Sequence, residues 1–121
     1  MLLRSPSTPE LMLLEYLISG IANWRPSEKM RENLKVGAMN DGRMGSLRLF
    51  PSGSEDQNAQ FGKCASACHF TDEDGVEIIA SLNLDQYGNL YELDLWKTDF
   101  GKLIRIPENK NELRRGGLDI N

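Results

Sequence analysis

Residues 70–100 read FTDEDGVEIIASLNLDQYGNLYELDLWKTDF. Apolar and polar residues alternate through this stretch, and two glycine-containing turn signals interrupt the alternation. Alternation with a period of two between turn signals is typical of consecutive strands in one antiparallel sheet. The pattern therefore predicts strands at about 76–84 and 90–97, with turns at 72–75 and 85–89.

A helix is predicted ahead of the sheet. Ser7 and Glu10 have the spacing of a capping box, and Pro9 falls in the first turn, where its missing N–H costs little. Apolar residues then recur at helical spacing, which predicts a helix from about Thr8 to Ile21 with one face in the core. These apolar residues are Leu11, Leu13, Leu14, Leu17, Ile18 and Ile21.

The other segments complete the predicted architecture. The residues after Ser27 favour one or two further helical turns, and the Asn40-Asp41-Gly42 turn signal joins two short alternating runs into a hairpin. The fold class is therefore α+β, with an N-terminal helix packed on an antiparallel β-meander of about five strands. The remaining predictions are strands at about 34–39, 45–50 and 61–70, a loop at 51–60, and an edge strand or end-packing segment at 103–106.

The length of 121 residues predicts a single domain, 1–121, with an ordered core at about 8–106. Residues 107–121 are polar and are expected to form a frayed C-terminal tail. No window approaches the ~18 apolar residues that cross a bilayer, and Glu10 and Glu15 interrupt the N-terminal apolar pattern. We therefore expect a protein that does not bind membranes.

The charge is unevenly distributed. The chain carries 14 basic and 18 acidic residues, a formal net charge of −4, while residues 70–100 hold eight carboxylates and only Lys97, which sums to −7. This balance argues against a general nucleic-acid-binding protein, which should present a basic face. It suits a protein whose sheet meets a cationic partner. Two cysteines are too few for a secreted disulfide scaffold, so a reducing cytoplasm is the expected location.

The segment Cys64-x-x-x-Cys68-His69 resembles a metal or thiol site at first sight. On a regular strand the two cysteines share a face but lie about 13 Å apart, which is too far for one zinc ion or a disulfide. Adjacent strand residues point to opposite faces, so His69 does not serve Cys68 as a base. We expect two small buried thiols, with no metal and no cofactor.

Glu92 and Asp94 lie on one strand face about 7 Å apart, within the range of carboxyl pairs in glycoside hydrolysis. An acid–base pair also needs a cleft and unequal environments, which the sequence does not indicate, so a solvated sheet face or pairing with neighbouring Arg and Lys is favoured over catalysis. Beside Trp96 the same residues would also make a protein-binding patch, an aromatic anchor framed by negative charge. A third interpretation is structural: Trp96 and Phe100 cap the core, while Asp94 or Asp99 accepts backbone N–H groups at a turn. The residues alone leave these alternatives open.

Three motifs carry a family resemblance: DGRMGSL at 41–47, FTDEDGV at 70–76 and LNLDQYGNLYELDLWKTDF at 82–100. Together they resemble a family of small, uncharacterised bacterial domains marked by a DGGMGSL-like turn and an ELDIWKVDF-like strand. Arg43 stands where that pattern has Gly, and Thr98 where Val is usual. The resemblance implies no established chemistry. Similar small acidic domains occur as immunity proteins beside bacterial toxins.

The favoured functional hypothesis is a cytoplasmic protein-binding module of the immunity type, which holds a basic toxin through an acidic sheet face. An enzyme is the less favoured interpretation, as a small hydrolase that uses Glu92 and Asp94 or the Cys68 thiol. An oligomeric accessory domain, such as a homodimer, is the third. The residues predicted to contact a partner are Asp72, Asp74, Glu92, Asp94, Trp96 and Asp99.

Overall fold

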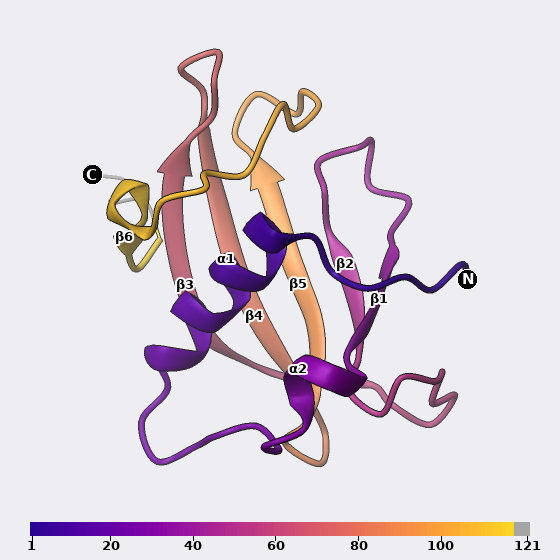
Figure 1. Cartoon of the computed structure of the whole chain (residues 1–121). Helices are drawn as coiled ribbons and strands as arrows, with labels where there is room; N and C mark the ends of the chain where they lie inside the picture. Colours follow the sequence, from indigo (N-terminus) through magenta and orange to yellow (C-terminus); the bar gives the residue numbers. More distant parts are fainter. Residues whose placement is uncertain (118–121) are drawn as a thin grey trace.

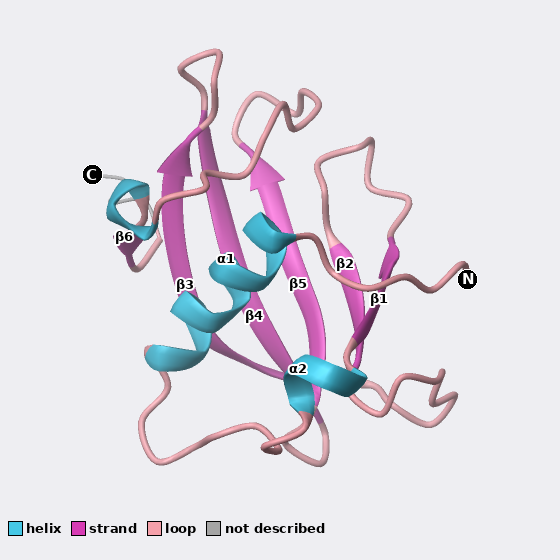
Figure 2. Cartoon of the chain, in the orientation of Figure 1, coloured by secondary structure: helices cyan, strands magenta, loops and turns pink. Residues whose placement is uncertain are grey.

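The computed structural model describes residues 1–117 of the chain. One long helix packs on one face of a six-stranded antiparallel sheet with strand order β1-β2-β5-β4-β3-β6, so the fold class is α+β as predicted (Figures 1 and 2). The elements are α1 (Thr8–Ser19), α2 (Met30–Asn33), β1 (Lys35–Ala38), β2 (Leu47–Phe50), β3 (Phe61–Thr71), β4 (Glu77–Asp85), β5 (Leu90–Lys97), the 3-10 helix η1 (Lys110–Glu112) and β6 (Arg114–Arg115).

Helix α1 begins as its sequence predicts. The Ser7 hydroxyl accepts the Glu10 amide N–H at 3.3 Å, and the Glu10 carboxylate accepts the Ser7 amide N–H at 2.7 Å, which completes the capping box. The helix ends at Ser19, two residues earlier than predicted, because Gly20 caps it with a bond to the Leu17 carbonyl. The core face of the helix consists of Leu13, Leu14, Leu17 and Ile18.

The predicted alternation sets the faces of the central strands. Buried side chains of β4 lie under α1, and alternate residues of β5 join them in the same core. The opposite face of the sheet carries no helix in the described part of the chain (Figure 1). The core residues of these two strands are Ile78, Ala80, Leu82, Leu84, Leu90, Leu93 and Leu95.

The connectivity departs from a simple meander at one step. Strands β3, β4 and β5 follow one another in the sheet, but β2 pairs with β5 rather than with β3. Residues 51–60, predicted as a loop, carry the chain between these two parts of the sheet. The hairpin of β1 and β2 therefore lies beside β5, and β5 is an interior strand of the sheet.

The C-terminal segment corrects one prediction. Residues 103–106 form no strand but pack across the end of the sheet, the other predicted alternative, with Ile106 and Leu103 against the core. The sixth strand comes from Arg114 and Arg115, in the segment expected to fray. The reason is local: Leu113 is only 5% exposed, and the amide N–H of Gly116 continues the pairing by bonding the Ala67 carbonyl. The segment is polar in composition, but its one buried apolar residue, Leu113, holds it against the core. The last four residues of the predicted tail lie outside the described residues.

A bulge in β3 corrects the prediction for the cysteines. Cys64 pairs with Asn83 and Ser66 with Leu82, so β3 has one extra residue, Ala65, between these two pairs. The extra residue moves Cys64 to the face opposite that of Cys68. Cys68 is a buried core thiol as predicted, whereas Cys64 is exposed.

Candidate functional site

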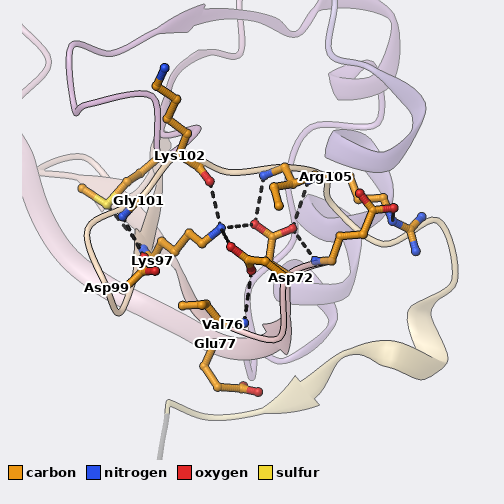
Figure 3. Close-up of polar contacts among 12 residues, drawn as sticks. Asp72, Val76, Glu77, Lys97, Asp99, Gly101, Lys102 and Arg105 are labelled. Carbon is orange, nitrogen blue, oxygen red and sulfur yellow. Dashed lines mark hydrogen bonds and ion pairs between the residues drawn. The ribbon is translucent and has the colours of Figure 1, made fainter.

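The three motif segments meet at one end of the sheet. There the turn between β3 and β4 folds so that the Asp72 carbonyl accepts the Gly75 amide at 2.9 Å, with Gly75 in the left-handed region at φ +84. The carboxylate of Asp72 is only 3% exposed. It accepts backbone N–H groups from Glu73 at 2.7 Å, Ile104 at 2.9 Å and Arg105 at 3.2 Å (Figure 3).

Lys97, the last residue of β5, places its ammonium group against this carboxylate. Its Nζ lies 2.9 Å from Asp72 Oδ2, 2.7 Å from Asp74 Oδ2 and 2.9 Å from the Lys102 carbonyl oxygen (Figure 3). The three N–H groups of an ammonium ion therefore all have acceptors. Lys97 is 1% exposed, so the pair with Asp72 is a buried and fully hydrogen-bonded ion pair.

The environment keeps both groups charged. Burial alone would raise the pKa of Asp72, but the bonds from the Ile104 amide, the Lys97 ammonium and nearby amides outweigh it and hold the pKa below its ordinary value. Burial likewise would lower the pKa of Lys97, yet its bonds to Asp74 and Asp72 raise the pKa above its ordinary value. We therefore assign this cluster a structural role: it ties the β3–β4 turn, the end of β5 and residues 102–105 together.

This cluster changes the predicted contact set. Asp72 is buried and cannot reach a partner, and Asp74, whose side chain is 38% exposed, bonds Lys97. Asp85, in the next turn, is also buried, and its carboxylate accepts the amides of Tyr87 and Asn89, both at 2.9 Å. Several carboxylates of the acidic stretch thus act inside the fold, so the sheet face is less negative than the sequence suggests.

The DGRMGSL segment braces the neighbouring hairpin. The Asp41 carboxylate accepts the amides of Met44 at 3.1 Å and Ser46 at 2.9 Å. The buried Ser46 hydroxyl accepts the Leu95 amide at 2.9 Å and donates to the Leu95 carbonyl at 3.2 Å, which ties the residue before β2 to the backbone of β5. Gly45 lies at φ +97, with no room for a Cβ beside Leu103. This motif is therefore structural.

An exposed aromatic pair lies beside this braced end of the sheet. The rings of Trp96 and Phe100 pack with centroids 6.1 Å apart at an angle of 58°, and the side chains are 38% and 72% exposed. Asp94 lies on the same strand face as Trp96, and Asp99 precedes Phe100 in the turn; both are exposed. The structure thus groups Asp94, Trp96 and Asp99 of the predicted set and adds Phe100.

Phe100 combines two features that folding alone does not favour. It is a large exposed apolar side chain, and its backbone lies in the left-handed region at φ +63. A residue with a Cβ in this region costs roughly 1–2 kcal/mol, and glycine is the usual choice. The turn is held by the Phe100 amide N–H, which bonds the Lys97 carbonyl at 2.8 Å, and by Asp99, which accepts the Gly101 amide N–H at 2.8 Å. The predicted backbone role of Asp99 is therefore present.

Glu92 lies further along the same strand face and is partly buried. Burial, together with the nearby Asp94 carboxylate, raises the pKa of Glu92 above its ordinary value, although the Asn83 amide donates to its carboxylate at 3.1 Å. Arg48 sits opposite Glu92 in the strand pairing but stacks its guanidinium 4.1 Å from the centre of the Tyr91 ring. Glu92 thus lies between Arg48 and Asn83 within the sheet, and its carboxylate bonds Asn83.

The hydrolase interpretation gains no support from this geometry. Glu92 and Asp94 line none of five well-formed hollows on the described surface, and an acid–base pair needs a cleft. Cys68 is fully buried, and burial raises the pKa of its thiol to about 11, which keeps it protonated at neutral pH. His69 contacts the Gly116 carbonyl oxygen at 3.0 Å through Nδ1.

Among residues 1–117, no three His, Cys, Asp or Glu side chains are arranged to hold a metal ion. No helix in that part of the chain is long and apolar enough to cross a membrane.

The fold and the cluster define a small α+β domain with one sheet face covered by a helix and one open face. Residues 3–107 match the profile of the family described as "Domain of unknown function (DUF6984)", and the chain belongs to this family. The match agrees with the expected uncharacterised domain. No curated protein and no solved structure matches the chain significantly.

Two residues at the site were not in the predicted set. The sequence indicates Lys97 only as the one basic residue of the acidic stretch, and Phe100 enters only one of the open interpretations, as a cap on the core. The signal for Lys97 was present in the sequence, because it follows Leu93 and Leu95 on the inward face of β5. No comparable signal marks the backbone of Phe100.

Proposed function

We propose that this chain is a protein-binding module of the immunity type, which uses the open sheet face and the turn after β5 to hold a cationic partner such as a basic toxin. The observation that carries the proposal is Phe100, exposed and held in a backbone conformation that favours glycine. Exposed aromatic residues backed by a rigid scaffold are typical anchors of protein interfaces. The Lys97 cluster supplies that rigidity directly beneath the turn.

The charges around the anchor favour a basic partner. Asp94 and Asp99 flank the aromatic pair, and Glu92 lies further along the same strand. Carboxylates that face lysine or arginine accelerate encounter and fix the orientation of the complex. The partner should therefore present basic side chains around an apolar pocket that accepts Trp96 and Phe100.

The test is a pull-down from a lysate of the native cell, with four baits: the unchanged protein, Trp96→Ala, Phe100→Ala and Tyr87→Ala. Tyr87 is the matched control, because it is 69% exposed but lies in the β4–β5 turn at the other end of β5. A basic protein captured by the unchanged and Tyr87→Ala baits, and lost with the other two, supports the proposal. Equal capture by all four baits contradicts it.

Association kinetics with the captured protein then test the charges. The association rate should fall steeply with added salt, and Asp94→Lys should reduce it further. Glu28→Lys, an exposed charge reversal before α2, is the control. A second copy of the chain is the competing occupant of this face, and concentration-dependent sedimentation that Phe100→Ala abolishes would identify it.

A further inference from the structure

A groove runs along the outer side of α1, on the helix-bearing side of the molecule. It has a volume of about 860 Å³, which is within the range of small-molecule and peptide pockets. Its walls come from α1, from Arg31 of α2 and from residues 110–115, the segment that lies beside α1 in Figure 1. The helix residues that line it extend from Thr8 to Ser19, about 16 Å at 1.5 Å per residue.

The floor of this groove is apolar and only partly buried. Leu11, Met12 and Tyr16 form a second apolar stripe on α1, beside the stripe that enters the core, and they are half-buried. Leu113 closes the floor from the C-terminal segment and is buried. Helical spacing predicts Leu11 on the core face, but the inner face of α1 is already filled by Leu13, Leu14, Leu17 and Ile18. Leu11 is therefore available to a ligand.

The rim of the groove is cationic. Arg31, Lys110 and Arg115 line it together with one carboxylate, Glu15, which pairs with Arg31. The Arg115 guanidinium lies 3.8 Å from the centre of the Tyr16 ring and donates to the Tyr16 carbonyl at 2.7 Å, which fixes its position. Lys110 enters none of the ion pairs among residues 1–117. The formal charge of the lining is +2.

We propose that this groove is a second docking site, whose occupant is an acidic amphipathic segment of a partner protein. The apolar floor takes two or three apolar side chains spaced along the segment, and Lys110, Arg31 and Arg115 take its carboxylates. The groove has the opposite charge to the open sheet face, so it selects a chemically different partner. The inference is independent of the proposed function, because the two surfaces share no residue.

The first experiment selects 12-residue peptides from a phage-displayed random library against the immobilised full chain, with excess Lys110→Glu protein present as a competitor. Enriched sequences should carry apolar residues together with Asp or Glu. Enrichment of sequences without carboxylates, or no enrichment, would overturn the proposal.

The second experiment measures the affinity of the best selected peptide, labelled with fluorescein, by fluorescence anisotropy. Lys110→Glu should weaken binding at least tenfold, and Met12→Glu should weaken it similarly by placing a charge on the floor. Lys29→Glu is the matched control, because Lys29 is exposed and does not line the groove, and it should leave the affinity unchanged. An unchanged affinity for Lys110→Glu, in protein that unfolds like the parent, would refute the site. Displacement of the peptide from the unchanged protein by excess Lys110→Glu protein, whose own groove does not hold the peptide, would assign the groove to a second copy and equally refute it.

Discussion

The ammonium group of Lys97 lies 2.9 Å from the carboxylate of Asp72, and neither residue is exposed by more than 3%. Each residue ends the inward-facing row of its strand: Cys68 and Phe70 precede Asp72, and Leu93 and Leu95 precede Lys97. The ion pair therefore closes the core at one end of the sheet. Removing one partner of such a pair leaves an uncompensated buried charge.

Asp72→Asn should lower the free energy of unfolding by about 3 kcal/mol, because the neutral amide no longer balances Lys97 and cannot accept all of the surrounding N–H groups. Urea denaturation followed by circular dichroism measures the change. Glu73→Gln is the control, since its side chain is 61% exposed, and it should change stability by less than about 0.5 kcal/mol. Similar losses in both variants would show that the buried pair has no special role.

The stability should depend on pH in a way that identifies Asp72. Its folded pKa is held below the ordinary value of 3.8, so below that pH the unfolded chain binds a proton that the folded chain excludes. The contribution is complete above the unfolded pKa and is lost as the pH falls through the folded pKa. The urea midpoints of the unchanged protein and of Asp72→Asn, measured between pH 3 and 7, should therefore approach each other as the pH falls. A constant gap between them would contradict this assignment.

Because the Phe100 backbone is left-handed, glycine at this position should give a more stable protein than alanine, the reverse of the usual order. Both Phe100→Gly and Phe100→Ala remove the ring contact with Trp96, so the difference between them reports the backbone. At an ordinary position glycine is the less stable by about 0.5–1 kcal/mol. Here Phe100→Gly should be the more stable by about 1 kcal/mol, because glycine enters this region without strain. Chemical denaturation measures the stability of both variants. A Phe100→Ala variant at least as stable as Phe100→Gly would rule out backbone strain.

The bulge at Ala65 should separate the two thiols in reactivity. Cys64 is exposed, while Cys68 is fully buried with a pKa raised to about 11. One equivalent of thiol should react rapidly with Ellman's reagent in native protein, and the second only as fast as the protein opens. Cys64→Ser should abolish the rapid phase and retain the slow one. If two equivalents of thiol reacted rapidly, both cysteines would lie at the surface, and this result would contradict the bulge at Ala65.

Much of the fold follows from local patterns in the sequence. The capping box at Ser7, the glycine turns and the period-two alternation predict α1 and the central strands within about two residues. These features are local, so the sequence displays them directly. The bulge at Ala65 and the pairing of β2 with β5 depend on contacts between distant segments, and no residue pattern announces them.

The predicted contact set contains residues that the structure places in different environments. A count of charges in the sequence treats Asp72 and Asp94 alike, but Asp72 is buried against Lys97 and Asp94 is exposed. Burial of a carboxylate becomes predictable only when a lysine on an inward strand position is recognised as needing a partner. The exposure of Phe100 depends on the backbone of one turn, which follows from the contacts of Lys97 and Asp99 rather than from residue type.

The Lys97 cluster also bears on the order of events during folding. Its members come from positions 72–74, 97 and 102–105, so it forms only after β3, β4 and β5 have found their register. We expect these contacts to form late in folding, so that their loss speeds unfolding more than it slows folding. On this expectation the cluster determines how long the native state persists rather than how quickly it is reached.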